Sequence, residues 1–536
     1  ITAAYGTAIS VKSVIFIKNI GALKLHYFSI FYAQNCIFLR NRATCNGVAM
    51  YAVGTKIVYL YKVKVIRNSP LSTILCSGGG VFMVSISKCS LIMSFFIQNS
   101  APISGGAFQI SSVKTITVFK VTFVNNSVTS MDSENRKQGG AMLLSGVSKC
   151  FIASSSFIGN LAFWTGGIDI LSGRTIYINK VTFINNFGGG IHMRKCNCFV
   201  KNCSFIGNKV RLDHAGELCV KSAKRVRVLG TTLLGNSKNA LYIVKCTKVV
   251  INKCALIKNR GRHGGALYIS ICEVVSLINS QFLANSAGSG GAVYSKMFRK
   301  FIILKSLFLG NKASYGGSIS ISTSDLSINV IALSCFKSNL AYDRGGCLFF
   351  QMTSLISQTK VFIANVHFLN NEAKASGAIF YSGFLREVYF HLVIVSSIPK
   401  MFLGTTSVSL YCTKVSFANT IFTNLIKHIS ILDLHFDTTA FMKNVTFFCA
   451  NLMYLNELLI LGKTSQLFFK CSKCERSKYI LVSESWPVSK TIHHDTFLQT
   501  QKSFVCHLCP PNAVCLHGTI SVQPDHWGYV MDRKLH

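Results

Sequence analysis

The stretch Phe282-Leu283-Ala284-Asn285 is followed within a few residues by Gly290-Gly291-Ala292-Val293, and this pair of marks recurs along the chain. An aromatic or aliphatic residue stands three positions before an Asn in thirteen copies, whose Asn residues lie 22 to 34 positions apart. Self-similarity at such a period is the sequence signature of a repeat architecture. The copies are Phe38–Asn41, Val65–Asn68, Phe96–Asn99, Phe123–Asn126, Phe157–Asn160, Phe183–Asn186, Phe205–Asn208, Leu233–Asn236, Leu256–Asn259, Phe282–Asn285, Phe308–Asn311, Phe336–Asn339 and Phe368–Asn371.

The Gly-Gly mark and the segments between the marks predict what each repeat folds into. Apolar and polar residues alternate in segments such as Thr115-Ile116-Thr117-Val118, which is typical of strands with one buried face. The repeats are too short for propeller blades and carry too little helical pattern for a helical solenoid. We therefore predict an all-β, right-handed parallel β-helix of the pectin-lyase-like kind. The Gly-Gly marks begin at Gly105, Gly139, Gly166, Gly188, Gly264, Gly290, Gly316 and Gly345.

The repeated residues have structural roles in such a coil. Neighbouring strands lie about 4.8 Å apart, so the Phe positions are expected to stack inside the coil. The Asn side chains can both donate and accept hydrogen bonds, which predicts an amide ladder along the axis. The Gly pairs allow a positive φ or a close approach at a tight corner. The array is expected over residues 1–460, with its clearest repeats in 30–381, and a cysteine-rich extension over 461–536.

The charge of the chain is strongly unbalanced, with 56 Lys and Arg against 18 Asp and Glu and a formal net charge of +38. Such a field attracts polyanions, although a basic solvated surface would give the same count. One set of basic residues lies 8 to 10 residues before the Phe position and another lies three residues before it, which predicts two lengthwise basic stripes. The alternative is that Lys occupies outward positions because its stem covers the surface while its head stays hydrated. The first set is Lys56, Lys88, Lys114, Lys149, Arg174, Lys195, Lys224, Lys248 and Lys300, and the second is Lys62, Lys120, Lys180, Lys253 and Lys305.

The pairing of Phe-x-x-Asn with Gly-Gly-Ala-Ile/Leu/Val resembles the polymorphic outer-membrane proteins, which are autotransporter adhesins of intracellular bacteria. The resemblance covers roughly residues 30–381 and implies a surface-exposed β-helical passenger that mediates adhesion. The chain departs from that family at its C-terminal end, where no series of ten-residue alternating strands for a membrane barrel is found.

The C-terminal part instead contains Cys506-His-Leu-Cys509-Pro510-Pro511-Asn-Ala-Val-Cys515, followed by Pro524-Asp-His-Trp527-Gly528-Tyr529. This stretch resembles the extracellular cysteine-rich segments that follow β-helical repeats in large eukaryotic surface proteins. The resemblance implies a fragment of a larger secreted or membrane-anchored protein. It favours disulfides among the tail cysteines, although the two Cys-x-x-Cys pairs leave zinc binding open. The disulfide candidates are Cys471, Cys474, Cys506, Cys509 and Cys515, and their pairing does not follow from the sequence.

Many β-helices are polysaccharide lyases or glycoside hydrolases, and those enzymes need clustered acidic residues. The acids here fall in different repeats and at different places within them, for example Asp169, Asp325 and Asp343. The densest group, Asp213-His214 with Glu217, is expected in a solvated loop, and His493-His494-Asp495 is an equally weak candidate. We predict no catalytic residue, no cofactor and no metal site.

The sequence therefore favours a non-enzymatic adhesion or structural protein of the cell surface or extracellular space. Its expected partner is an acidic glycan or another polyanion, without specific nucleic-acid binding, and the alternative is a carbohydrate-active enzyme. No apolar run is long enough to span a bilayer. The chain begins with Ile1 and is expected to be a processed or partial protein. Three glycosylation sequons begin at Asn125, Asn202 and Asn444, but the first two fall within repeats, where a glycan is not expected to fit.

Overall fold

The structure is a computed structural model that forms two compact units, Ile1–Gln281 and Phe282–His536. Among the described residues there is no helix, and hence none long and apolar enough to cross a membrane. The structure describes residues 2–396 except 22, 45, 72–75, 130–137, 212–215, 324–326, 353–357 and 383–384, and it further describes 408–410, 412–425, 429–434, 439–449, 453–461, 466–473, 478–479, 485–492, 498–500, 507–510, 513–516, 519–522, 530–531 and 534–535.

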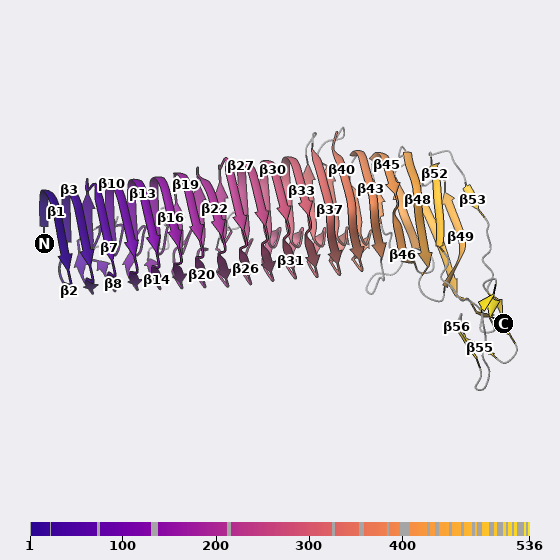
Figure 1. The fold of residues 1–536 in the computed structure, drawn as a ribbon, viewed down its shortest axis with the longest axis horizontal. Helices are drawn as coiled ribbons and strands as arrows, with labels where there is room; N and C mark the ends of the chain where they lie inside the picture. The colour runs from indigo at the N-terminus through magenta and orange to yellow at the C-terminus, as the bar shows by residue number, and fades with distance from the viewer. Residues whose placement is uncertain are drawn as a thin grey trace. The chain divides into compact units, whose positions relative to one another are not determined.

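Each coil of the first unit carries a long strand, or two shorter strands in its place, followed by a three-residue strand (Figure 1). Strand β13 (Phe108–Phe119) pairs in parallel with β10 (Val81–Ile92) on one side and with β16 (Met142–Ala153) on the other. The predicted right-handed parallel β-helix is confirmed. The other members of the long-strand series are β1 (Thr2–Lys12), β3 (Leu23–Gln34), β6 (Met50–Val53), β7 (Ile57–Tyr61), β18 (Ile168–Ile170), β19 (Gly173–Asn179), β21 (Ile191–Arg194), β22 (Asn197–Lys201), β24 (Leu218–Lys221), β25 (Arg225–Leu229), β27 (Leu241–Asn252) and β30 (Leu267–Ile278).

The three-residue strands carry the Phe position at their centre, with its side chain buried and its two neighbours turned outward. The rings stack face to face, with centroid distances of 4.8 Å for Phe96–Phe123 and 4.7 Å for Phe123–Phe157. Full burial of each such side chain contributes roughly 1.5–3 kcal/mol. The predicted stack is thus present inside the coil. The strands of this series are β2 (Ile15–Ile17), β4 (Ile37–Leu39), β8 (Lys64–Ile66), β11 (Phe95–Ile97), β14 (Thr122–Val124), β17 (Ser156–Ile158), β20 (Thr182–Ile184), β23 (Ser204–Ile206), β26 (Thr232–Leu234) and β28 (Ala255–Ile257).

The Asn residues form the expected ladder, and all of them are buried. Asn99 Nδ2 donates to Asn126 Oδ1 at 3.0 Å, and Asn126 Nδ2 donates to Asn160 Oδ1 at 2.9 Å. Each amide also binds the backbone, as Asn126 Nδ2 does at the carbonyl of Phe96. Every polar atom of the side chain is therefore satisfied without water, which is what a buried amide requires.

The Gly pairs form the corner that precedes each long strand. The first glycine takes a left-handed conformation in most pairs, with φ of +58° at Gly105 and +68° at Gly139, but Gly166 does not have a positive φ. The second lies against the next coil, because a Cβ on Gly106 would stand 2.3 Å from the carbonyl oxygen of Gly140. No side chain fits there, which explains the repeat of two glycines.

The second unit repeats the same architecture. Phe282, Phe308, Phe336 and Phe368 stack at 4.6 to 5.3 Å, and Asn311 Nδ2 donates to Asn339 Oδ1 at 3.0 Å. The parallel strands of its main sheet are β33 (Val293–Leu304), β34 (Leu307–Leu309), β36 (Ile319–Thr323), β37 (Ile328–Lys337), β39 (Leu348–Met352), β40 (Lys360–Leu369), β42 (Ile379–Ser382), β43 (Leu385–Ser396), β44 (Val408–Leu410), β45 (Cys412–Ala418), β46 (Ile421–Leu425), β47 (Ile429–Leu434) and β48 (Thr439–Cys449). A second sheet pairs β32 (Ser286–Ser289), β35 (Lys312–Tyr315), β38 (Leu340–Arg344) and β41 (Glu372–Ala375) in parallel.

Pairing in the second unit becomes antiparallel towards its C-terminal end. Strand β50 (Gln466–Lys473) pairs antiparallel with β47 and with β49 (Met453–Leu461), and β52 (Ser485–Ile492) pairs antiparallel with β48. A hairpin of β55 (Ala513–Leu516) and β56 (Thr519–Val522) follows. The expected division at residue 460 stays a prediction.

Candidate functional site

The first set of basic residues lies along one edge of the first unit, at the start of the second half of each long strand. Lys88, Lys149 and Lys248 occupy one register position, shared with Ile57, Thr115, Thr175, Asn197 and Arg225 in the intervening coils. Lys56, Lys114, Arg174 and Lys224 stand one residue earlier in their own coils. We call this surface the basic edge, and it consists of Lys56, Lys88, Lys114, Lys149, Arg174, Lys195, Lys224, Arg225 and Lys248.

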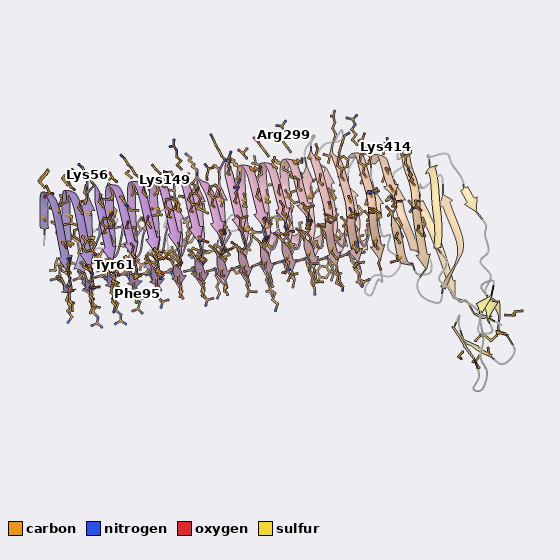
Figure 2. The ribbon with its side chains drawn as sticks, in the orientation of Figure 1. Lys56, Tyr61, Phe95, Lys149, Arg299 and Lys414 are labelled. Atoms are coloured by element: carbon orange, nitrogen blue, oxygen red, sulfur yellow. A yellow bond between two sulfur atoms is a disulfide. The ribbon has the colours of Figure 1, made fainter. Side chains whose placement is uncertain are left out.

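The sequence predicted that these cations stack in one register, but most of them occupy one of two adjacent positions. Lys195 is the exception, because it stands at the bend two residues before the register position of Asn197, with a φ of +53°. From Lys56 to Arg174, successive coils place the charge first at the earlier and then at the later position, with Ser or Thr at the free position in most of these coils. Like charges directly opposite each other destabilise a sheet, and the alternation moves them apart. All nine side chains are exposed, and none forms an ion pair with a described carboxylate. Lys56 and Lys149 both extend from this edge in Figure 2.

The second set shares one register, at the corner that ends each long strand, but it does not occupy consecutive coils. Lys62, Lys120, Lys180 and Lys253 all have a positive φ between +51° and +54°. Met93, Ser154 and Asn202 hold the same corner in coils between them. The lysines therefore recur every second or third coil, roughly 10–15 Å apart, and not at the 4.8 Å spacing expected from the sequence. We call these four residues the corner row.

In the second unit the corresponding positions are only partly basic. Lys300 and Lys305 are exposed at the same places in their coil. Further along, Lys360 Nζ lies 2.8 Å from Glu387 Oε2, and Lys414 is the register partner of Glu387 on its other side. Because Glu387 neutralises this stretch, we assign the polyanion candidate to the first unit. Arg299 and Lys414 mark these positions in Figure 2.

Between the basic edge and the corner row, a short aromatic ladder faces outward. Phe151 and Tyr177 stack with centroids 5.2 Å apart, Tyr177 and Phe199 at 4.8 Å, and the guanidinium of Arg227 lies 5.7 Å from the centre of Phe199. The ring faces therefore cover one another and present their edges to solvent. A platform for stacking sugar rings needs free faces, so this ladder supports stability more than sugar recognition.

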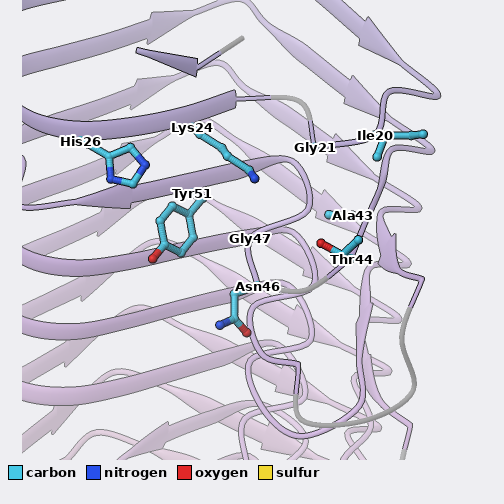
Figure 3. Close-up of a pocket in the computed structure, with 9 residues that line it drawn as sticks. All are labelled: Ile20, Gly21, Lys24, His26, Ala43, Thr44, Asn46, Gly47 and Tyr51. Carbon is cyan, nitrogen blue, oxygen red and sulfur yellow. The ribbon is translucent and has the colours of Figure 1, made fainter. Parts of the chain in front are cut away.

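A cavity of about 330 Å³ opens in the first coils of the first unit (Figure 3). Its polar lining comes from Lys24, His26, Thr44, Asn46 and Tyr51, and none of the described residues that line it is acidic. Glycoside hydrolysis needs a pair of carboxyl groups, which this lining does not provide.

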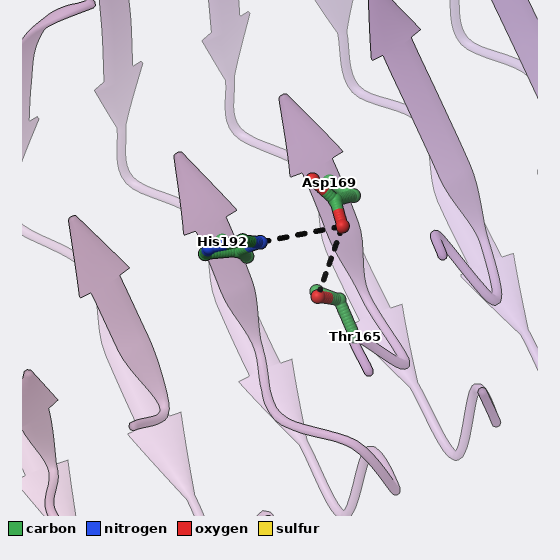
Figure 4. Close-up of polar contacts among 3 residues, drawn as sticks. All are labelled: Thr165, Asp169 and His192. Carbon is green, nitrogen blue, oxygen red and sulfur yellow. Dashed lines mark hydrogen bonds and ion pairs between the residues drawn. The ribbon is translucent and has the colours of Figure 1, made fainter. Parts of the chain in front are cut away.

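Sequence reasoning missed a row of three ionisable side chains on consecutive strands. Asp169 of β18 is the register partner of His192 in β21, and His192 is the partner of Cys219 in β24. His192 Nδ1 lies 3.4 Å from Asp169 Oδ2, and Thr165 Oγ1 donates to the same oxygen at 3.3 Å (Figure 4). We call these residues the Asp–His–Cys row.

The Asp–His–Cys row is buried, with exposed fractions of 0% for Asp169, 6% for His192 and 1% for Cys219. Burial disfavours the imidazolium and would lower the pKa of His192, but Cys219 and Asp169 on either side raise that pKa to about 10. The signal was present in the sequence, because each of the three residues stands one position after the apolar residue that follows the corner. Alignment on the Phe position hid it, since the number of residues between Phe and the corner varies.

Glu217 is buried and does not lie in a solvated loop as expected, while Asp213 and His214 fall outside the described residues. It precedes Leu218 at the place that Gly190 and Ala240 hold in adjacent coils, so its side chain enters the interior. Neither carboxyl oxygen has a hydrogen-bond partner among the described residues. Burial raises the pKa of Glu217 well above its usual range. The N–H of Gly190 lies close enough to oppose this in part, although it donates its hydrogen bond to the backbone carbonyl of Glu217 and not to the carboxyl group.

Two of the tail cysteines are paired in the structure, in a disulfide between Cys509 and Cys515. A zinc site at Cys506-x-x-Cys509 would need the thiolate of Cys509, which the disulfide consumes. Cys474 and Cys506 fall outside the described residues, as does the side chain of Cys471. His493-His494-Asp495 and the Pro524–Tyr529 stretch also fall outside them.

All three sequon asparagines lie on exposed corners, contrary to the expectation that two of them would leave no room for a glycan. Asn125, Asn202 and Asn444 have φ values of +51°, +51° and +53°, and each is exposed. Asn tolerates the left-handed conformation better than most residues, which explains its presence there.

A family model described as a right handed beta helix region matches residues 139–300 of the chain. No curated protein matches the chain. A parallel β-helix is compatible with a surface protein or a carbohydrate-related protein, and by itself it does not separate adhesion from enzymatic activity. The chain is thus a right-handed β-helix repeat protein, similar over residues 139–300 to that family.

Proposed function

We propose that the chain is a non-enzymatic adhesion protein of the cell surface or extracellular space that binds an acidic polysaccharide along its basic edge. The observation that carries the proposal is the unbroken series of exposed cations on eight consecutive coils of the first unit, with no described carboxylate paired to them. The resemblance to polymorphic outer-membrane proteins and to extracellular cysteine-rich segments supports the adhesive role and the location.

The geometry of the basic edge suits a long, flexible anion. Eight coils at about 4.8 Å span roughly 35 Å, and each contributes at least one cation. Exposed lysine and arginine side chains can follow a linear ligand without forming a fixed pocket. The ligand is therefore expected to be recognised by its line of negative charge and not by the shape of one sugar.

Heparin affinity of the full chain tests this proposal. The edge variant changes Lys56, Lys88, Lys114 and Lys149 to Gln. We expect it to lose at least about tenfold in affinity at low salt, because close, unpaired cations act together on one anion. Binding of the unchanged chain should weaken steeply as the Debye length falls from about 10 Å at 0.1 M salt to about 3 Å at 1 M.

Two matched controls keep the change in net charge equal. The corner variant changes Lys62, Lys120, Lys180 and Lys253 to Asn, which suits their positive φ. A scattered variant changes four other exposed lysines of the first unit to Gln. Equal losses in the edge and scattered variants would show that only total charge matters and would overturn the proposed site. The scattered set is Lys12, Lys64, Lys209 and Lys258.

The second candidate function is a carbohydrate-active enzyme, and the described acids give it little support. Asp169 lies between Leu143 and His192 in its register, and Glu387 lies between Lys360 and Lys414. Neither has a second carboxylate beside it in the sheet, as hydrolysis of a glycosidic bond requires. Release of reducing sugar from acidic polysaccharides by the purified chain would favour the enzyme instead.

A further inference from the structure

We propose that Asn125 and Asn202 are N-glycosylation sites, and that the folded coil carries an oligosaccharide on the side-chain amide of each. The proposal rests on the extracellular location proposed above, and it does not depend on polyanion binding. The substrate class is an oligosaccharide that is linked through a diphosphate to a lipid, the donor used for N-glycosylation of secreted proteins.

Both residues meet the sequence requirement for this modification. Asn125-Asn126-Ser127 and Asn202-Cys203-Ser204 each place a hydroxyl residue two positions after the Asn, without Pro between them. Such a triplet occurs often by chance. The surroundings of each Asn in the folded chain therefore decide whether it can carry a glycan.

Each Asn stands at a corner that turns its side chain out of the coil. Asn125 directly follows β14, Asn202 directly follows β22, and both have a φ of +51°. Both are exposed, whereas the next residues, Asn126 and Cys203, are only 0% and 1% exposed. A glycan on either Asn would therefore project into solvent, where its bulk displaces no packed side chain.

The next coil leaves room beside each Asn, because a glycine follows the paired strand at the same corner. A Cβ on Gly159 would stand 2.3 Å from Oδ1 of Asn125, and a Cβ on Gly230 would stand 2.6 Å from Oδ1 of Asn202. Apart from the chain neighbours of the glycine, Cγ of the same Asn is the only other heavy atom of the described residues within 4 Å of that point. Nδ2, the atom that takes the sugar, is therefore turned away from the next coil.

Asn185 has the same surroundings without the sequence motif. Its φ is +51°, it is exposed, and its Oδ1 lies 2.6 Å from the position of a Cβ on Gly207 in the next coil. Phe187 stands two residues after it, where the motif needs Ser or Thr. Asn185 is thus a matched control within the chain.

The third sequon, in the second unit, differs from these two. Nδ2 of Asn444 donates to Oδ1 of Asn419 at 2.9 Å, so the nitrogen that would take the sugar faces a neighbouring coil. The proposal is therefore confined to Asn125 and Asn202.

The modification is a balanced glycosyl transfer. Nδ2 of the Asn attacks the anomeric carbon of the donor sugar, and the new C–N bond forms as the bond from that carbon to the diphosphate oxygen breaks. Nδ2 loses one proton and keeps the other, while the lipid diphosphate leaves with the bonding electrons. The transfer precedes folding, so the fold must accommodate an Asn that already carries its glycan.

Glycans at these corners would leave the basic edge open. Asn197 holds the edge register in the coil of Asn202, and five residues of extended strand separate the two by roughly 16 Å. Asn202 itself lies in the corner row, between Lys180 and Lys253. Its glycan would therefore cover part of the corner row and not the edge.

The test expresses the full chain behind a secretion signal in cultured eukaryotic cells. Peptide N-glycosidase converts each glycosylated Asn to Asp, and peptide mass spectrometry measures the converted fraction in the secreted protein. We expect conversion at Asn125 and Asn202 in most secreted chains, and none at Asn185. The proposal fails for whichever of the two sites is unmodified in the secreted protein, including the case in which glycosylated chains are retained in the cell because the fold rejects the glycan.

Two variants test the recognition of each site without changing the corner Asn. Ser127→Ala and Ser204→Ala should each abolish conversion at the site that loses its hydroxyl, leave the other site converted, and leave the circular dichroism spectrum unchanged. Conversion that persists in either variant would show deamidation and not glycosylation, and it would overturn the assignment at that site. Heparin affinity of the chain made in bacteria, without glycans, tests the polyanion proposal separately, so the two proposals can fail independently.

Discussion

Two kinds of position restrict which residue type this fold accepts: the buried positions of the core and the left-handed corners between strands. Phe123 and Asn126 could be assigned from the sequence because their side-chain chemistry states their roles, a stacked ring and a laddered amide. The left-handed corners could not be predicted, because Lys120, Ser154 and Asn202 hold equivalent places and share no side-chain property. The backbone, and not the side chain, decides those positions.

Glu217 gives a prediction at this scale. Its folded-state pKa is raised, so folding keeps the proton that the unfolded chain loses above about pH 4.3. Stability from this group is therefore complete at low pH and falls by up to about 1.4 kcal/mol per pH unit as pH rises towards the folded pKa. Glu217→Gln should remove that slope, so that the variant becomes more stable than the parent at pH 7 and matches it near pH 4.

Guanidinium denaturation at pH 4, 5.5 and 7 measures this difference. Glu372→Gln, at a half-exposed carboxylate, is the matched control and should leave the slope of the parent in place. A Glu217→Gln chain that tracks the parent at all three pH values would show that the carboxyl is ionised in the fold.

Whole elements were easier to predict than the sites they carry. Alternating segments such as Thr115–Val118 predicted the long strands, because side chains on one side of each strand face the interior of the coil. The Asp–His–Cys row was lost because coils differ by up to twelve residues in length, and register between strands is set by corners that the sequence marks only weakly. The two alternating positions of the first predicted stripe have another cause, because its members lie at different distances from the Phe position, for example 9 residues for Lys56 and 8 for Lys88.

The Asn ladder is the element whose loss should be most costly. Asn126 Oδ1 accepts from both the backbone N–H and Nδ2 of Asn99, and its Nδ2 donates to Asn160. Asn126→Leu keeps the size but leaves those buried groups without partners, so we expect the free energy of unfolding to fall by about 2–5 kcal/mol. Asn125→Gly changes the adjacent exposed Asn, whose φ is +51°, and should be neutral or slightly stabilising.

Chemical denaturation of the two variants and the parent measures these changes in the free energy of unfolding. A typical substitution lowers the free energy of unfolding by about 1 kcal/mol. If Asn126→Leu lowers it by less than that, the hydrogen bonds of the ladder make no special contribution to the stability of the fold.

The molecule as a whole carries far more positive charge than it can pair. With 56 basic against 18 acidic residues, most cations of the described surface face water or one another. Net charge of this size keeps a chain soluble but works against compactness through self-repulsion. The arrangement of the cations then matters, because repulsion in water falls from about 0.8 kcal/mol per pair at 5 Å to about 0.4 at 10 Å before salt screens it.

The basic edge and the corner row differ in this spacing, and the difference predicts their response to salt. Edge cations lie on consecutive coils, whereas corner lysines are separated by at least one coil. The edge variant should therefore gain more stability at 0.01 M salt than at 1 M salt, where the Debye length is about 3 Å. The corner variant should show a smaller salt-dependent gain. Its Lys→Asn changes also suit the positive φ, and that part of the gain should be the same at both salt concentrations.

Thermal unfolding of both variants and the parent at the two salt concentrations measures these gains in stability. If the corner variant gains as much as the edge variant on lowering the salt, the repulsion comes from the total charge, and the alternation along the edge has no energetic consequence.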